Sequence, residues 1–288
     1  MTTVTRDILK IAYPVRPPEV KKYDYGLLLV IGGSEFYSGA PALAALAGFR
    51  AGVDMVRVIA PKRSADIIAS FSPMLAAYPL NNSHVLKEHL ATLLSLAESA
   101  KDVAHGNVSV VLGNGLGRSQ ETQETIFEFL KQTSLPVVID GDGLHAVAKD
   151  PAIISGRNFI LTPNTFEFQL VTGKEVRALE PDARVAVVKE EAARLGTTIV
   201  LKVKTDIISN GGEVMLNESG SPYMSIGGAG DTMAGIIGAM VARGLPSMTA
   251  AAAGAYINGK AGEIAAKKMK ESLVVTDIID AIAEAISQ

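Results

Sequence analysis

The sequence predicts an α/β protein with a central, mainly parallel β-sheet, helices on both of its faces and a small antiparallel edge. Two observations support this prediction. Short apolar runs rich in β-branched residues alternate with longer segments of helical periodicity, which is typical of successive βαβ units. Further along the chain, two short apolar runs flank Asn210-Gly211-Gly212, whose glycines favour the positive φ angles of a tight hairpin.

The expected elements follow in chain order. A strand over residues 26–31 leads into an alanine-rich helix over 38–52. Further strands are expected at 55–60, 108–112, 137–140, 159–161, 198–202, 206–209 and 213–217, and helices at 230–243, 248–267 and 277–286. Met233 and Met240 share one face of their helix, so we expect them in the core. Nothing in the composition marks a linker or a repeat, and we expect one domain over residues 1–288.

Composition limits the class of protein. The chain has 288 residues, 48% of them hydrophobic, which is ample for the buried core of a globular enzyme. Its formal net charge of -3 is spread along the chain and gives no reason to expect a nucleic-acid partner. The absence of cysteine excludes disulfides, thiolate zinc sites and a cysteine nucleophile. Since no signal peptide or membrane-spanning stretch is evident, we expect a cytoplasmic protein with no membrane partner.

The chemistry centres on a glycine-rich turn at the start of a helix. Gly228-Ala229-Gly230-Asp231 can direct several backbone N–H groups toward one point, where an anion would bind. Asp231, in the first turn, can then take the proton of a hydroxyl that attacks a phosphoryl group. Aspartate is also a common helix cap, and this motif alone gives the two interpretations equal weight. The surrounding loops favour catalysis.

Two further glycine-rich loops follow strands of the expected sheet. Residues 32–40 (GGSEFYSGA) come after the first strand, and residues 111–117 (VLGNGLG) end another. Ligands of open α/β sheets bind beyond the carboxyl ends of strands, where both loops lie. The first loop fits neither the dinucleotide fingerprint G-x-G-x-x-G nor the phosphate loop G-x-x-x-x-G-K-[ST], which disfavours a Rossmann dehydrogenase. Each loop alone is more simply a tight turn, whereas together they suggest one shared cleft.

Polar side chains follow three more strands. Asp140 and Asp142 emerge at a strand end, where they can hold a hydrated Mg²⁺ ion or form turns beside glycine, and turn formation is the favoured interpretation. Asn164 and Glu167 begin a helix, which is compatible with a ligand contact and with ordinary capping. Lys202 ends a strand from which its ammonium can reach a phosphate, although most single lysines are only surface groups.

In this order, the motifs resemble those of the ADP- or ATP-dependent NAD(P)H-hydrate dehydratases, a branch of the ribokinase-like superfamily. The turn at 228–231 alone indicates only the superfamily, whereas the whole set is more specific. The matching segments, which extend over nearly the whole chain, are residues 34–58, 111–117, 137–147, 161–173 and 228–244. The resemblance therefore implies a ribokinase-like fold.

The resemblance also implies a reaction. Members of this family repair NADH or NADPH to whose nicotinamide ring water has added, by phosphorylating the ring hydroxyl of the (6S) hydrate and eliminating phosphate. It implies Mg²⁺ as a cofactor and ADP as the co-substrate, with ATP as the other candidate. It implies a homo-oligomer, for example a tetramer. Many microbial relatives carry an N-terminal epimerase domain, for which the segment before Gly26 is too short, so we expect a separate epimerase protein.

By the same resemblance, individual residues receive roles. Asp231 would be the base that activates the hydroxyl, while the amides of residues 228–230 would stabilise charge on the transferring phosphoryl group. The positions that match the substrate contacts of the family are Ala40, Gly115, Asn164 and Asp231. The positions that match its nucleotide contacts are Lys202, Val203, Lys204, Thr205, Asp206, Gly228, Ala229 and Gly230. No residue is assigned to a metal.

Two positions depart from the family pattern. Before the glutamate, where the family has histidine and Pro-Gly, this chain has Asn164, Thr165 and Phe166. Where the family has Leu-Lys-Gly, this chain has Val203 after Lys202, which adds bulk where glycine lets backbone and ligand approach closely. These departures bear on the substrate contact and on the nucleotide preference, respectively.

Two other classes of protein explain part of the pattern. A ribokinase-like kinase of a hydroxymethylpyrimidine or hydroxyethylthiazole alcohol would share the aspartate turn, but the matches over residues 39–58 and 111–117 favour the dehydratase. A non-catalytic nucleotide-binding protein would keep the glycine-rich loops and lack Asp231, so the presence of Asp231 argues against that class.

Overall fold

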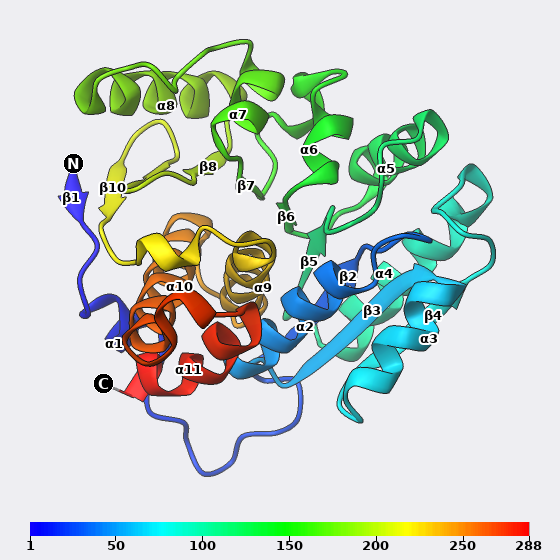
Figure 1. Cartoon of the computed structure of the whole chain (residues 1–288). Helices are drawn as coiled ribbons and strands as arrows, with labels where there is room; N and C mark the ends of the chain where they lie inside the picture. The colour runs from blue at the N-terminus through cyan, green and yellow to red at the C-terminus, as the bar shows by residue number, and fades with distance from the viewer. Residues whose placement is uncertain (288) are drawn as a thin grey trace.

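A ten-stranded sheet forms the centre of the molecule in the computed structural model, which describes residues 1–287 (Figure 1). The strands run in the order β1-β10-β9-β8-β7-β6-β5-β2-β3-β4. Within the described chain β9 is antiparallel to β8 and β10, and the other neighbouring pairs are parallel. Their bounds are β1 Thr2–Thr3, β2 Leu27–Ile31, β3 Met55–Pro61, β4 Ala76–Leu80, β5 Val108–Leu112, β6 Val137–Ile139, β7 Phe159–Leu161, β8 Thr198–Leu201, β9 Asp206–Ser209 and β10 Val214–Asn217. The predicted α/β class is confirmed.

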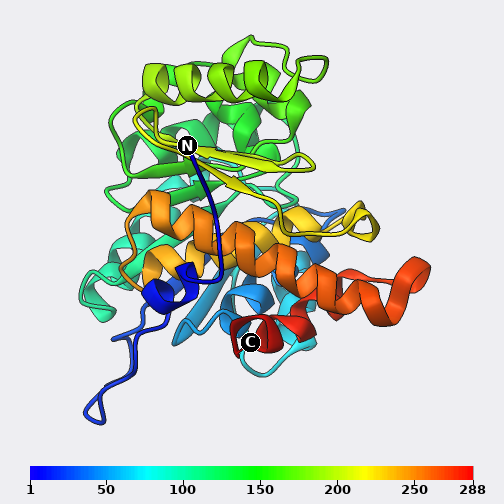
Figure 2. The same cartoon turned by 90° about the vertical axis from the view of Figure 1, so that its left-hand side faces the viewer.

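Helices cover both faces of this sheet, as Figure 2 shows with α8 on one side and α10 and α11 on the other. Helices α1, α2, α3, α9, α10 and α11 contribute to one buried cluster, and α4 to α8 contribute to a second. Their bounds are α1 Ile8–Ala12, α2 Gly39–Arg50, α3 Lys62–Phe71, α4 Leu90–Val103, α5 Gln120–Gln132, α6 Asp142–Val147, α7 Thr165–Thr172, α8 Pro181–Leu195, α9 Ala229–Ala242, α10 Ser247–Met269 and α11 Val275–Ser287. Among residues 1–287, no helix combines the length and apolarity that a bilayer crossing requires.

The central strands are buried on both faces, which explains their uninterrupted apolar sequences. Along β2, Leu28 and Val30 enter the first cluster, whereas Leu27, Leu29 and Ile31 enter the second. Because successive side chains of a strand point to opposite faces, both sets must be apolar. The sheet is therefore held in place from both sides, and the ends of its strands are fixed positions for the loops that follow.

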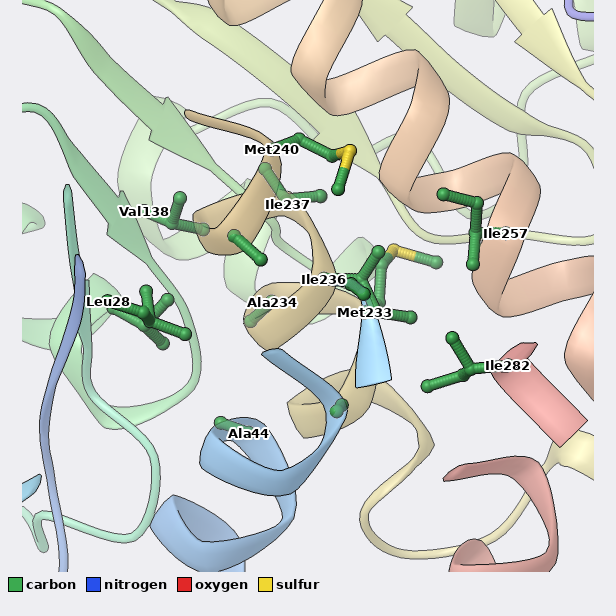
Figure 3. Packing of buried hydrophobic residues seen from close by; sticks show 14 of the residues in the cluster. Leu28, Ala44, Val138, Met233, Ala234, Ile236, Ile237, Met240, Ile257 and Ile282 are labelled. Atoms are coloured by element: carbon green, nitrogen blue, oxygen red, sulfur yellow. The ribbon is translucent and has the colours of Figure 1, made fainter. Parts of the chain in front are cut away.

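Helix α9 lies in the middle of the first cluster, and Figure 3 shows it between Leu28 and Val138 of the sheet and Ile257 and Ile282 of α10 and α11. Met233 and Met240 are 7% and 0% exposed, so their predicted core position is confirmed. Helix α2 approaches α9 so closely that a Cβ added at Gly235 would lie 2.1 Å from the carbonyl oxygen of Ala44. This close packing fixes the direction in which the first turn of α9 points.

The hairpin between β9 and β10 forms as the sequence predicts. Gly211 has a φ of 88°, and the Asn210 side chain accepts hydrogen bonds from the N–H groups of Gly212 and Glu213 at 3.0 and 2.8 Å. The antiparallel part of the sheet is confirmed, but the hairpin is not the outermost element, because β1 pairs in parallel with β10.

Strands β1 and β4, which the sequence did not predict, are the two edges of the sheet. Strand β1 contains only two residues, and β4 has mostly exposed side chains with no apolar alternation. Pro79 lies within β4, which an edge strand tolerates because one side of its backbone needs no partner. Neither strand therefore carries a recognisable hydrophobic pattern.

Candidate active site

The loops that follow the central parallel strands lie side by side at the carboxyl ends of these strands. The Gly33 N–H donates to the Asn114 carbonyl at 2.9 Å, which joins the loops after β2 and β5. A Cβ added at Gly113, whose φ is 125°, would lie 1.8 Å from the Asp140 carbonyl oxygen, so only glycine allows the loops after β5 and β6 to touch. The Lys202 N–H donates to the Pro163 carbonyl at 2.9 Å and joins the loops after β7 and β8.

The glycine-rich turn at residues 228–231 begins α9 beside these loops. Gly228 is the N-cap with a φ of 103°, and Asp231 lies in the first turn. The first N–H groups of a helix have no carbonyl partner within the helix, and its dipole places partial positive charge there. Asn258 of α10 fixes this turn, because its Oδ1 accepts from Thr232 Oγ1 at 2.7 Å and its Nδ2 donates to the Ala229 carbonyl at 3.3 Å. The glycine-rich turn therefore lies at the start of a helix, as the sequence predicts, and anion binding there stays a prediction.

A continuous polar network connects this turn to the strand ends. Asn114 Nδ2 donates to Asp231 Oδ1 at 2.6 Å and to Asp140 Oδ2 at 3.1 Å. Asp140 Oδ1 accepts from Thr162 Oγ1 at 2.8 Å and from Lys202 Nζ at 2.7 Å. One network therefore joins α9 to the ends of β5, β6, β7 and β8.

The electrostatics of the network suit a base and a cation. Burial, followed by the neighbouring Asp140 carboxylate, raises the pKa of Asp231 to about 7, although Asn114 and Lys202 oppose this rise. Burial alone would lower the pKa of Lys202, but the carboxylates of Asp140 and Glu167 outweigh it and raise that pKa. Near neutral pH, Asp231 can therefore exchange a proton while Lys202 stays charged.

Asp140 and Asp142 are both engaged by groups of the protein. Asp142 accepts from the Gly117 N–H at 2.9 Å and from Arg118 Nε at 2.8 Å. Asp140 already neutralises Lys202, and no group of three or more His, Cys, Asp or Glu residues is placed to hold a metal among residues 1–287. Gly141 has a φ of 50°, in line with a turn. The structure thus gives no support to a magnesium site made by this pair.

The positions that were expected to contact the substrate lie around the network. A Cβ added at Gly115 would lie 3.4 Å from Ala40 Cβ, so α2 and the loop after β5 are in contact there. Asn164 is the exposed N-cap of α7, where its Oδ1 accepts from the Glu167 N–H at 2.9 Å and its own N–H donates to Glu167 Oε2 at 2.8 Å. This reciprocal capping box confirms the capping interpretation of Asn164.

The positions that were expected to contact the nucleotide divide into two groups. Lys202 reaches the turn, because its Nζ is 3.1 Å from a Cβ added at Gly230. Lys204 is exposed and Thr205 is half-buried. By contrast, Val203 packs against the second core cluster, so its bulk is directed toward the protein interior. Asp206 is 7% exposed and also points into the protein.

Asp206 holds the loop after β8 in shape. Its Oδ1 accepts from the Val203 N–H at 3.3 Å, and its Oδ2 accepts from Asn217 Nδ2 at 3.0 Å. Burial raises the pKa of Asp206 to about 6, since these hydrogen bonds only partly offset the loss of solvent. Both carboxylate oxygens are used inside the protein.

Substitution of Asp206 by asparagine is expected to change how stability depends on pH. An aspartate whose pKa is higher in the folded state binds more protons there, so stability falls as the pH rises between about 4 and 6. Asp206→Asn removes this titration. Relative to wild type, the free energy of unfolding of the variant should therefore rise by about 1–3 kcal/mol between pH 4 and pH 6. Urea denaturation at pH 4, 5, 6 and 7 measures it, and a pH-independent difference would contradict the prediction.

Two buried asparagines, Asn114 and Asn258, are candidate site residues that were not predicted from the sequence. Both are 1% exposed, and both hydrogen-bond to residues of the α9 turn or its aspartate. Asn114 lies between two glycines directly after a buried strand, and Asn258 interrupts a helix face of alanine and glycine. A buried polar residue in apolar surroundings requires partners, which is the signal that each position offered.

Comparison with known proteins identifies the family. The family model described as NAD(P)H-hydrate dehydratase matches residues 28–284. The chain is 37% identical to a bifunctional NAD(P)H-hydrate repair enzyme of Hyperthermus butylicus over 96% of this chain and 52% of that protein, so it spans about half of that relative. It is 30% identical to an ADP-dependent (S)-NAD(P)H-hydrate dehydratase of Nitrosopumilus maritimus, covering 97% of this chain and 95% of that one.

Among solved structures, a ribokinase-like superfamily protein from Enterococcus faecalis matches with a TM-score of 0.84 and 25% identity, covering 100% of this chain and 95% of that one. The predicted ribokinase-like fold is confirmed. The family match extends from β2 into α11 and therefore includes every loop of the polar network. The chain belongs to the NAD(P)H-hydrate dehydratase family of ribokinase-like fold.

Proposed function

We propose that this protein dehydrates the (6S) hydrate of NADH or NADPH, with ADP as the co-substrate and ATP as the alternative. The observation that carries the proposal is the Asp231 carboxylate in the first turn of α9, linked through Asn114 to Asp140. A carboxylate with a pKa of about 7 in the first turn of a helix can take a hydroxyl proton next to a phosphoryl group. Family membership and the name of the Nitrosopumilus maritimus relative support the substrate and ADP.

The proposed reaction has two stages. First, Asp231 takes the proton of the ring hydroxyl, and the oxygen bonds to the terminal phosphorus of the nucleotide while the bond to the bridging oxygen breaks. Lys202 and the first amides of α9 stabilise the negative charge of the transferring group. Second, the carbon–oxygen bond breaks, phosphate leaves, and the adjacent ring carbon loses a proton. The conjugated dihydropyridine is thereby restored.

Each wall of the site receives a proposed role. Ala40, Gly115 and Asn164 surround the substrate side, in line with the contact between Ala40 and Gly115. The nucleotide side is formed by Lys202 and the amides of residues 228–230, with Lys204 and Thr205 at its more exposed end. Val203 and Asp206 act by shaping the loop, because their side chains pack or hydrogen-bond within the protein.

Further features of the proposal concern the cofactor and the cellular setting. Mg²⁺ would arrive with the nucleotide phosphates, since Asp140 and Asp142 are occupied by other groups and no step of the mechanism requires a protein-held ion. We also propose one catalytic domain over residues 1–288, a homo-oligomeric assembly and a cytoplasmic location. Interconversion of the two hydrate epimers would be performed by another domain or protein.

The direct test is turnover of the hydrate. The purified protein is incubated with (6S)-hydrated NADH or NADPH, Mg²⁺ and either ADP or ATP, and the recovery of reduced-nicotinamide absorbance and the release of phosphate are followed. Equal amounts of both products are expected, and neither without nucleotide. Phosphorylation of a hydroxymethylpyrimidine or hydroxyethylthiazole alcohol, with no turnover of either hydrate, would overturn the proposal in favour of a kinase.

A further inference from the structure

Asn114 lies between the two carboxylates that dominate the site. Its amide nitrogen carries two hydrogens, and it contacts Asp231 Oδ1 at 2.6 Å and Asp140 Oδ2 at 3.1 Å. Ionised carboxylates only accept hydrogen bonds, and the amide nitrogen is accordingly the atom that faces them. Two carboxylates that would otherwise repel each other are thus bridged by a single neutral donor.

The backbone leaves Asn114 little freedom to move. Its carbonyl accepts from the Gly33 N–H at 2.9 Å, and the preceding N–H of Gly113 donates to the Ile31 carbonyl at 3.2 Å. On its other side, the backbone of Gly113 touches that of Asp140. The Asn114 side chain therefore leaves the backbone from a point fixed by two neighbouring strands.

The Asp140 end of the bridge is anchored as well. Its Oδ1 is held by Thr162 and by the Lys202 ammonium, which leaves Oδ2 for Asn114. The two hydrogens of an amide group point in fixed directions relative to each other. When one of them is bonded to an anchored acceptor, the direction of the other is therefore defined. That second hydrogen points at Asp231.

Burial makes these two hydrogen bonds the defining contacts of the amide. Asn114 is 1% exposed, and its amide nitrogen donates to both carboxylates. A buried polar group depends on the partners that the protein supplies, so loss of the amide would leave both carboxylates without this donor.

We propose that Asn114 is a positioning residue, which orients the Asp231 carboxylate toward the substrate by tying it to the anchored Asp140. The inference rests on the proposed function insofar as Asp231 is the base. It adds a role for the loop at residues 113–117 that is distinct from glycine flexibility, because a side chain of this loop acts on the base. In this proposal Asn114 acts through Asp231 and does not itself transfer a proton.

The bridge also affects how readily Asp231 holds a proton. The charged groups that face Asp231 are Asp140 after β6, Asp142 on α6 and Lys202 after β8. The two carboxylates raise the pKa of Asp231, whereas the hydrogen bond from Asn114 and the charge of Lys202 lower it. Loss of the amide donors should therefore favour the protonated, inactive form of Asp231.

The test compares two variants that lose the donors in different ways. Asn114→Ala removes the side chain, while Asn114→Asp keeps its shape but replaces the donors with a third carboxylate. The titration of Asp231 is followed by ¹³C NMR of side-chain carboxyl groups, with Asp231→Asn identifying the resonance. We expect the midpoint to rise by about one pH unit in Asn114→Ala and by more in Asn114→Asp.

Kinetics supply the second readout. Both variants should lower kcat by about 10- to 100-fold with little change in KM, and should move the acid limb of the kcat/KM profile to higher pH. Ser109→Ala is the matched control, because it removes a buried 2.7 Å hydrogen bond that runs from β5, the strand before Asn114, to the Gly238 carbonyl. It should leave the titration and the pH profile unchanged even if it lowers stability.

Two outcomes would overturn the inference. An Asp231 titration that is the same in wild type and Asn114→Ala would show that Asn114 does not act on it. Wild-type behaviour of Asn114→Asp would show that the side chain only fills space. Because the NMR titration needs no substrate, failure of the hydrate assay with a shifted titration would reject the proposed function alone.

Discussion

Asp231→Asn is expected to lower kcat for hydrate turnover by about 10² to 10⁴-fold, since asparagine has the same shape but cannot accept the hydroxyl proton. Nucleotide binding should be largely retained, because its proposed contacts are the helix amides and Lys202. The measurement combines recovery of reduced-nicotinamide absorbance with calorimetric titration of ADP and ATP. A large loss of nucleotide affinity, with kcat unchanged at saturation, would assign Asp231 to binding instead of proton transfer.

A matched control separates catalysis from helix capping at this position. Asp277 also lies in the first turn of a helix, α11, where its Oδ2 accepts from the Val274 N–H at 2.9 Å. Asp277→Asn should leave turnover unchanged and alter stability by about 1 kcal/mol or less. If Asp231→Asn behaves in the same way, Asp231 is only a helix cap.

Gly235→Ala is expected to lower the free energy of unfolding by about 3 kcal/mol, a large effect for one added methyl group. The new Cβ would lie 2.1 Å from the Ala44 carbonyl oxygen, and both groups belong to rigid helices. Helices α2 and α9 would have to separate, which disturbs the packing shown in Figure 3. Chemical denaturation measures the loss, and the variant should also lose activity because α9 carries Asp231.

Gly39→Ala provides the comparison for this prediction. Gly39 begins α2, and a Cβ added there meets no atom within 4 Å. The same chemical change should be neutral or should stabilise by up to about 1 kcal/mol, because alanine favours the helical state. Equal effects of the two substitutions would contradict the role of close packing between α2 and α9.

The sequence predicted the central strands well because burial on both faces leaves a strong apolar signal. The run from Leu27 to Ile31 is apolar at every position, and the structure places a strand there. Strand β4 could not be found in this way, because its side chains are mostly exposed and Pro79 interrupts it. Strand β1 is too short to carry any pattern, and its pairing with β10 depends on the position of the completed sheet.

Within the site, too, residues with a local sequence signal were predicted and a residue without one was not. Asp231 was predicted from a local motif and Lys202 from its place at a strand end. In the structure Asn114 links Asp231 to Asp140, and Lys202 contacts Asp140 directly. The side chain of Asn114 had no such signal, since asparagine between glycines is a common turn former. Its partner Asp231 is 117 residues away in sequence. Only the three-dimensional arrangement shows that the two residues meet.

This separation in sequence has a consequence for how the protein folds. The hydrogen bond from Asn114 to Asp231 closes 117 residues of chain, and that from Lys202 to Asp140 closes 62. Contacts of such range form late, after the intervening strands have paired, so a partly folded chain cannot present the proposed base in position. A ligand that binds across these loops stabilises only the fully assembled sheet. Occupancy by nucleotide or substrate would therefore protect strands from β2 to β8 together against local opening and proteolysis.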